Sequence, residues 1–191
     1  MLDGAPPLRN AAVAFIGRGG DLPRTPVPRD LVDSRLAAAV LADQSPWAVE
    51  GREILAQLPW VPSGCDQTHW DRLLNDEEPS VVRGAIKGIG LRGDRSRVEC
   101  LLGMLSDWPY RSSLREALAT LARKEPGVLD RLERYLLSPG NPLQARMEIP
   151  RILARVSSQK SVDILLRHLA THVPIMRYQV LKALNRLQRR F

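Results

Sequence analysis

Residues 79–105 read PSVVRGAIKGIGLRGDRSRVECLLGML, and this stretch carries one complete structural unit. Apolar side chains recur at helical spacing in both halves: Val82, Ile86 and Ile89, then Val98, Leu101, Leu102 and Leu105. Between the halves, Gly93 tolerates the left-handed conformation that ends a helix, and Asp94 is a good cap for the next one. The stretch therefore predicts two amphipathic helices joined by a tight turn.

An arginine marks the same place in this unit and in its neighbours. These arginines follow one another at intervals of 31, 32, 31 and 31 residues: Arg52, Arg83, Arg115, Arg146 and Arg177. An aliphatic residue comes three positions after each of them, and a proline opens every unit: Pro46, Pro79, Pro109, Pro142 and Pro174. A fixed period in this range is typical of stacked-repeat proteins, in which each unit buries its apolar face against the next.

The pattern divides the chain into five helix pairs and a final unpaired helix. The predicted units are 6–43, 46–75, 79–106, 109–138 and 142–171, with a half unit at 174–191. In the first unit, Arg9 takes the place of the recurring arginine, and a proline-rich insertion delays the second helix to 30–42. Pro150 lies inside a first helix and predicts a kink, because proline removes a backbone hydrogen bond. We expect one all-α domain over residues 1–191.

Helix pairs of this length, opened by proline and carrying Arg-x-x-aliphatic in the first helix, resemble HEAT repeats. The resemblance covers nearly the whole chain and implies a right-handed α-solenoid, an armadillo-like helical array. Residues 176–187, MRYQVLKALNRL, are similar to a segment of the HEAT regions in certain large bacterial membrane proteins. In those proteins a nucleotide-transporter-like bundle precedes the repeats and a cyclic-nucleotide-binding domain can follow. This second resemblance implies a soluble region of a larger bacterial protein.

The recurring arginine has two interpretations. It lies about 60° and 120° around the helix from the apolar positions at +3 and +6, so its stem can cover apolar surface while its guanidinium reaches a carboxylate or carbonyl. Aspartates seven to nine residues upstream suggest a ladder between repeats: Asp43, Asp76 and Asp107, before Arg52, Arg83 and Arg115. We prefer this structural interpretation because an architectural position must repeat in every unit. The alternative is that these arginines bind an acidic partner.

No motif in the chain indicates catalysis or a cofactor. A Gly-x-Ser-x-Gly elbow, a phosphate-binding loop and His-Glu-x-x-His are all missing from the sequence. Gly88-x-Gly90-x-x-Gly93 matches the dinucleotide fingerprint as a string, but that fingerprint works between a strand and a helix. Histidine and cysteine pairs four residues apart lack the further ligands of a metal site. We therefore expect no catalytic residue, no metal and no cofactor, and we expect Cys100 to be a small core residue.

Charge and composition limit the partners and the compartment. The net charge is +7; residues 1–173 hold 23 Lys and Arg against 21 acids, and the last 18 residues add five bases and no acid. A nucleic-acid groove should spread its charge along a surface, whereas this surplus lies at one end of the chain. Two cysteines and no membrane-spanning run or signal segment favour the cytoplasm, or the cytosolic part of a membrane protein.

The leading functional hypothesis is a non-catalytic scaffold for protein–protein interaction, with a concave groove lined by the second helices. Candidate partner-binding residues are polar positions of those helices, Arg97, Arg131, Arg134 and Arg167, together with Trp60 in a Pro-Trp-Val-Pro turn. Trp47 and Trp108 adjoin repeat-opening prolines, so we expect them to wedge repeat junctions.

Three alternatives remain beside the scaffold hypothesis. The first is a basic nucleic-acid-binding repeat protein, whose affinity would fall steeply with salt. The second is an enzyme or enzyme assistant such as the HEAT-containing bilin lyases. The third is a basic C-terminal helix lying on an anionic membrane surface through Arg186, Arg189 and Arg190.

Overall fold

The computed structural model describes residues 48–58 and 67–189, and these residues form helices and connecting turns without a β-strand. This part of the chain is therefore all-α. The predicted first unit at 6–43, with Asp43, and the Trp47 and Trp60 positions lie outside the described residues. The α-helices in chain order are α3 (Val49–Ala56), α4 (Gln67–Leu74), α5 (Pro79–Arg92), α6 (Val98–Gly103), α7 (Arg111–Lys124), α8 (Gly127–Leu137), α9 (Leu143–Arg146), α10 (Glu148–Val156), α11 (Gln159–Arg167) and α12 (Pro174–Gln188).

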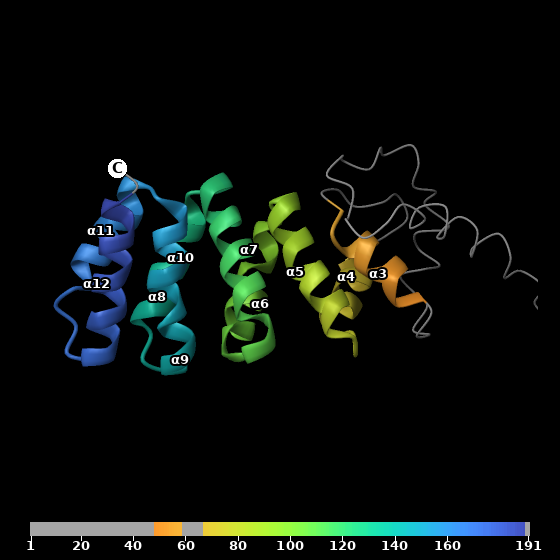
Figure 1. Cartoon of the computed structure of the whole chain (residues 1–191), viewed down its shortest axis with the longest axis horizontal. Coiled ribbons are helices and arrows are strands. Elements are labelled where there is room, and N and C mark those ends of the chain that lie inside the picture. The colour runs from red at the N-terminus through yellow and green to blue at the C-terminus, as the bar shows by residue number, and fades with distance from the viewer. Residues whose placement is uncertain (1–47, 59–66, 190–191) are drawn as a thin grey trace, which may run out of the picture.

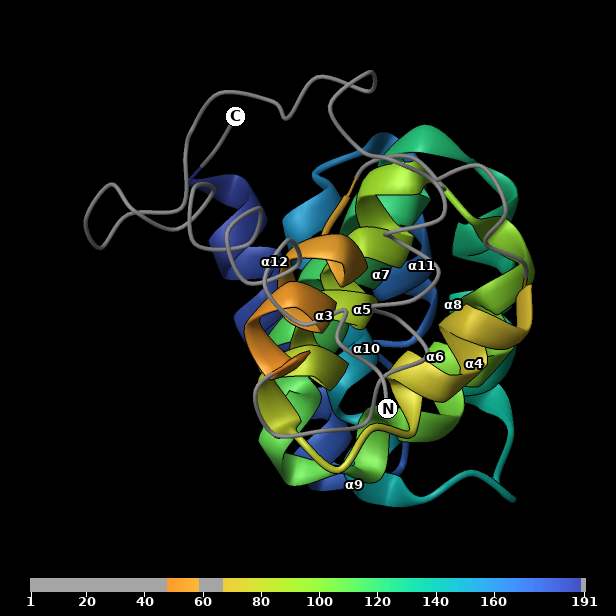
Figure 2. The ribbon, with the colours of Figure 1, turned by 90° about the vertical axis from the view of Figure 1, so that its right-hand side faces the viewer.

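The helices alternate between two layers that run along the molecule (Figure 1). In the first layer, α3, α5, α7, α10 and α12 pack one against the next. The second layer holds α4, α6, α8 and α11, and the end-on view separates the two layers clearly (Figure 2). Three short 3₁₀ segments adjoin these helices: η3 (Arg95–Arg97), η4 (Met104–Ser106) and η5 (Trp108–Tyr110). Helices in one layer run in the same direction, so their starts share one edge of the molecule.

The apolar side chains that recur in the sequence fill the space between the layers. The aliphatic residues three positions after the later arginines are fully buried: Ile86, Leu118, Ile149 and Val180. From the second layer, Leu101, Leu132 and Leu165 enter the same continuous cluster. Burying one such side chain stabilises the fold by about 1.5–3 kcal/mol relative to leaving it in water. The three- and four-residue spacing therefore identifies the faces on which the two layers meet.

Glycines in α5 allow its neighbours to approach closely. A β-carbon built at Gly88 would lie 1.9 Å from the carbonyl oxygen of Ala56 in α3, and one built at Gly90 would lie 2.9 Å from the Cα of Ala117 in α7. Gly93 has φ 77° and ends α5, while the Asp94 side chain accepts a hydrogen bond from the Ser96 amide, as predicted. The fingerprint-like string of glycines thus serves helix packing and helix termination.

Arg92, near the end of α5, connects three helices. Its Nη1 donates to the carbonyl oxygen of Leu58 at 2.9 Å and to that of Ala56 at 3.4 Å. The guanidinium also lies 3.9 Å from the ring centroid of Trp70 in α4, a cation–π distance. Burial lowers the pKa of Arg92 to about 10, against a weaker opposing effect of Asp94. Sequence analysis did not single out this contact.

Pro150 coincides with an interruption in the first layer. The first helix of this unit is divided into α9 and α10, with Met147 between them. Pro150 is the third residue of α10 and has no N–H to donate to the carbonyl of Arg146, four residues before it. The kink predicted from the sequence is therefore present, as a break between two helices.

Two expectations about single residues are wrong. Cys100 is exposed, because Val98, Leu101 and Leu102 take the buried stripe of α6 and Cys100 points away from it. Trp108 is 77% exposed and so does not wedge a repeat junction. Within the two described ranges, no helix combines the length and apolar character that crossing a bilayer requires.

Candidate binding surface

The recurring arginines take equivalent positions in the first layer but have different partners. Arg52 is buried, and its Nε donates to Oδ2 of Asp76 at 2.8 Å. Arg146 and Arg177 each donate to a backbone carbonyl between a second-layer helix and the next first-layer helix: Leu136 at 2.8 Å and Thr171 at 2.9 Å. Arg83 is exposed. Contacts with protein groups agree with a structural role for these arginines, which stays a prediction for the set as a whole.

The predicted pairing of each aspartate with the arginine that follows it is wrong where the structure describes it. Asp76 pairs with Arg52, and its other oxygen accepts from the Glu78 amide at 2.9 Å at the start of α5. Asp107 is exposed, while Arg115 contacts the carbonyl oxygen of Arg111 at 3.1 Å and the carboxylate of Glu148 at 3.5 Å. Asp76 lies between two units and stabilises the turn by pairing with the earlier arginine.

The second layer carries the ladder of ion pairs between repeats. Arg97 is paired with Asp71, and Arg167 makes a bidentate pair with Glu133 through hydrogen bonds of 2.8–3.1 Å. Arg131 donates to the carbonyl oxygen of Arg95 at 3.1 Å and lies 4.0 Å from Glu99. Lys160 and Asp130 add a further pair at 2.6 Å. Most positive charge of this layer is thus neutralised internally.

The candidate partner-binding residues therefore differ in availability. Three of the four arginines, Arg97, Arg131 and Arg167, contact groups of the preceding unit. Arg134 is exposed and has no carboxylate partner among the described residues. Trp60 lies outside those residues. Their role in binding a partner stays a prediction, but an approaching partner would have to compete with existing contacts at three of them.

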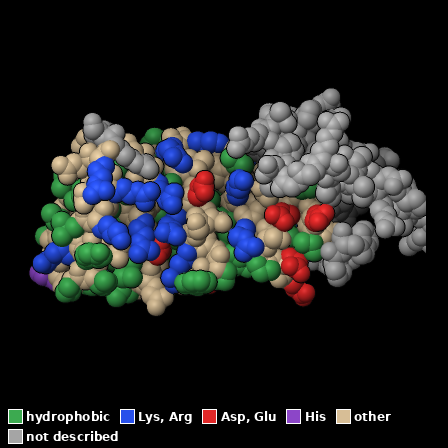
Figure 3. Space-filling view, in the orientation of Figure 1, with side chains coloured by type: hydrophobic (Ala, Val, Ile, Leu, Met, Phe, Trp, Pro, Cys, Tyr) green, Lys and Arg blue, Asp and Glu red, His purple; other side chains and the backbone are tan. Residues whose placement is uncertain are grey.

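The first layer, in contrast, carries a large excess of positive charge. Its helices α7, α10 and α12 hold four, two and three Lys or Arg residues against one, one and no acids. The neighbouring second-layer helices α6, α8 and α11 hold none, two and two bases against one, two and one acids. Figure 3 shows basic side chains gathered over the half of the molecule that contains α7, α10 and α12.

This distribution corrects the interpretation drawn from the linear sequence. The surplus was assigned to the last 18 residues, which include α12. In the fold, α12 packs against α10 and α10 packs against α7, so the three helices present one basic layer. The acids of residues 98–167 lie mostly on the second layer, where counting along the chain had allowed them to cancel the bases of the first.

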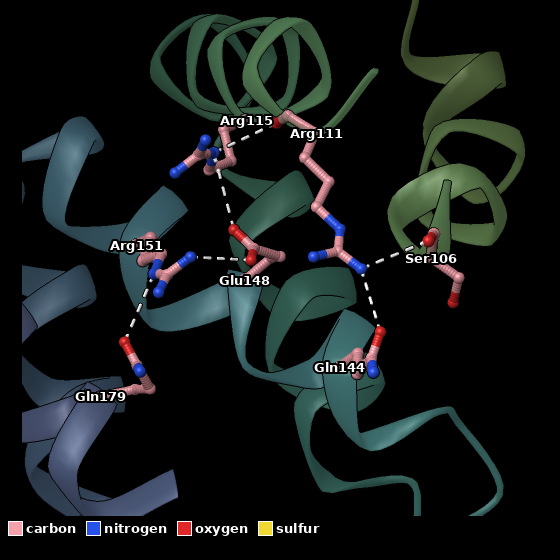
Figure 4. A network of polar contacts seen from close by, with 7 residues as sticks. All are labelled: Ser106, Arg111, Arg115, Gln144, Glu148, Arg151 and Gln179. Carbon is pink, nitrogen blue, oxygen red and sulfur yellow. Dashed lines mark hydrogen bonds and ion pairs between the residues drawn. The ribbon is translucent and has the colours of Figure 1, made fainter. Parts of the chain in front are cut away.

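A buried carboxylate lies at the centre of the basic layer (Figure 4). Glu148 is 2% exposed at the start of α10. Its Oε1 accepts from Nη1 of Arg151 at 2.8 Å, and its Oε2 lies 3.5 Å from Nε of Arg115 in α7. A buried carboxylate is tolerated when charged partners flank it, because they offset its lost hydration. Glu148 therefore joins two neighbouring first-layer helices.

Further side chains hold the guanidinium groups around Glu148 in place. Arg151 Nε donates to Oε1 of Gln179 in α12 at 3.3 Å. Arg111 Nη2 donates to Oε1 of Gln144 in α9 at 3.0 Å. Burial lowers the pKa of Arg115; Glu148 opposes this shift, and the neighbouring guanidinium groups of Arg151, Arg155 and Arg111 add to it. Four guanidinium groups thus surround one carboxylate, and we call these four residues the arginine cluster.

An apolar edge borders the basic layer at the starts of its helices. Trp108, Leu143 and Ile175 are 77%, 42% and 43% exposed, and they stand just before α7, at the start of α9 and at the second position of α12. The repeat-opening prolines of the same three units are exposed beside them. A groove of about 240 Å³ adds to this layer between α3, α5 and α7, with Arg83 and Lys87 among its lining residues.

Comparisons with known proteins leave the family open. No protein-family model matches the chain, and no curated protein matches it. Among solved structures, an engineered protein matches over 86% of this chain and 93% of its own, with 16% sequence identity and a TM-score of 0.36. A TM-score this low does not establish a shared fold. Within residues 48–58 and 67–189, no group of three or more His, Cys, Asp or Glu side chains could hold a metal ion.

Proposed function

We propose that this chain is a right-handed α-solenoid of HEAT-like helix pairs that acts as a non-catalytic scaffold and binds an acidic segment of a partner protein on its first layer. The observation that carries the proposal is the charge imbalance of α7, α10 and α12, nine bases against two acids. Stacked-repeat proteins use such extended surfaces for recognition. A complementary negative segment would be attracted by this field and oriented along the layer.

The first layer is favoured over the groove of second helices because of the charge left available. On the second layer, Arg97, Arg131 and Arg167 already contact the preceding unit. On the first layer, Arg155 and Arg186 have no carboxylate partner among the described residues. Truncating internal ion pairs to bind a partner would cost energy, whereas unpaired bases offer it directly. The proposal therefore moves the binding surface from the second helices to the first.

A matched pair of charge reversals tests this assignment. Arg155→Glu alters the first layer and Arg134→Glu alters the second, and neither residue has a carboxylate partner in the described structure. Binding of a fluorescent polyglutamate peptide, followed by anisotropy, should weaken in Arg155→Glu and remain near the wild-type value in Arg134→Glu. Circular dichroism checks that both variants fold. Equal losses in the two variants, or no loss in either, would contradict the first-layer assignment.

Nucleic-acid binding is the second candidate, because the same basic layer also suits phosphates. The exposed aliphatic side chains of Leu143 and Ile175 favour a protein segment, since they offer nothing to a sugar–phosphate backbone. Titration with mixed-sequence DNA and RNA at several salt concentrations separates the candidates. Tight binding with a steep linear fall in log affinity against log salt would support a nucleic acid. Negligible binding at low salt would dismiss it.

A further inference from the structure

We propose that the arginine cluster, Arg111, Arg115, Arg151 and Arg155, is a binding site for one phosphoryl group on a phosphorylated segment of the partner protein. This inference rests on the proposed function, because it names a modification on the partner and the place on the first layer that receives it. Two geometric features carry it: the excess of guanidinium groups over carboxylates, and the contacts that hold those groups close together (Figure 4).

Helix geometry brings the four arginines to one place. Arg111 and Arg115 are four residues apart on α7, and Arg151 and Arg155 are four residues apart on α10, so each pair projects from one helix face. The helices α7 and α10 pack directly against each other. Glu148 lies between the pairs and contacts Arg115 and Arg151. The cluster therefore has a net charge of +3 before any ligand binds.

The acceptors already present do not use the donors of the cluster fully. Nε of Arg111 is buried and has no hydrogen-bond acceptor among the described residues. Arg155 has no carboxylate partner there either, while Glu148 is shared between two guanidinium groups. The lowered pKa of Arg115 has the mutual repulsion of these cations among its causes. An anion entering the cluster would accept the spare donors and relieve that repulsion.

The cluster is held in position before a ligand arrives. Gln179 fixes Arg151, and Gln144 with the carbonyl oxygen of Ser106 fixes Arg111. The acceptors come from η4, α9 and α12, so three separate elements support the site. Binding then costs less side-chain entropy than it would for free surface arginines.

A phosphoryl group fits this charge better than a single carboxylate does. Phosphate on a side chain carries a charge close to −2 at neutral pH and three strong acceptor oxygens, whereas a carboxylate has one charge and two oxygens. Planar guanidinium groups bind phosphate through paired N–H bonds, and arginine clusters are the usual readers of phosphorylated segments. The apolar edge at Trp108, Leu143 and Ile175 would receive apolar side chains of the same segment.

The test uses inorganic phosphate and a short serine-containing peptide in phosphorylated and unphosphorylated forms, titrated into the full chain by calorimetry. Arg155→Gln removes one spare guanidinium and should weaken phosphopeptide binding about tenfold, as expected for one charge-assisted hydrogen bond. Arg155→Lys keeps the charge without the paired geometry and should fall between wild type and Arg155→Gln. Arg123→Gln is the control, because Arg123 lies on the same layer at the far end of α7 and contacts only Thr120.

Each outcome distinguishes this inference from the proposed function. Phosphopeptide binding that exceeds binding of the unphosphorylated form, and that falls in Arg155→Gln but not in Arg123→Gln, supports the site. Equal losses in the two glutamine variants would overturn the site while leaving a generally basic binding layer. Equal affinity for both peptide forms would also overturn it. Competition by short RNA as strong as that by the phosphopeptide would assign the cluster to a nucleic-acid backbone and contradict the inference.

Discussion

At the scale of single residues, the Arg52–Asp76 pair shows what the sequence reveals and what it hides. Periodicity identified Arg52 as a repeated position, and Asp76 as the acid of a ladder. The partner was misassigned because Asp76 is seven residues from Arg83 along the chain but lies beside Arg52 in the fold. Sequence distance does not specify which side of a turn an aspartate faces. The buried pair connects α3 to the start of α5, so it matters more than its place in the sequence suggests.

Asp76→Asn should destabilise the protein by about 3–5 kcal/mol, because it leaves the buried guanidinium of Arg52 without a counter-charge. Asp130→Asn is the matched control, since it breaks the exposed Lys160–Asp130 pair and should cost less than about 1 kcal/mol. Urea unfolding followed by circular dichroism measures both. Similar losses in the two variants would show that the Arg52–Asp76 pair is not stabilising as a buried ion pair.

At the scale of helices, the sequence predicts the elements well and their contacts less well. The breaks at Gly93-Asp94, the proline starts and the apolar stripes predict α5 to α12 closely, because helix caps and 3.6-residue periodicity are local signals. Close approach between helices is not local. Gly88 and Gly90 resemble a nucleotide motif until α3 and α7 are seen against them. The ladder of the second layer was missed for the same reason, although an acid about one repeat before each base is a signal that could have found it.

Gly88→Ala should destabilise the protein by about 1–3 kcal/mol, because its β-carbon would collide with the backbone of α3 at Ala56 and push the helices apart. Gly103→Ala in α6 is the control, since nothing lies within 4 Å of the position its β-carbon would take. That variant should be neutral or gain up to about 1 kcal/mol from helix propensity. Thermal unfolding of both variants checks the prediction, and a Gly88→Ala protein as stable as wild type would contradict the close contact.

At the scale of the whole molecule, function depends on how the fold distributes charge. Residue counts along the chain placed the surplus at the C-terminal end, whereas packing of α7, α10 and α12 side by side makes a basic layer from three units. The all-α architecture could be predicted from periodicity alone. The candidate site could not, because it depends on which of two alternating helices carries each charge and on buried contacts such as Glu148 with Arg151.

The most direct measurement is the mapping by NMR of where an acidic ligand contacts the chain. Polyglutamate peptide is titrated into isotopically labelled protein, and amide signals are followed for both layers. The account predicts shifts concentrated on α7, α10 and α12, with the strongest near Arg115, Arg151 and Arg155. Shifts concentrated on α6, α8 and α11 would contradict the central claim that the first layer receives the partner.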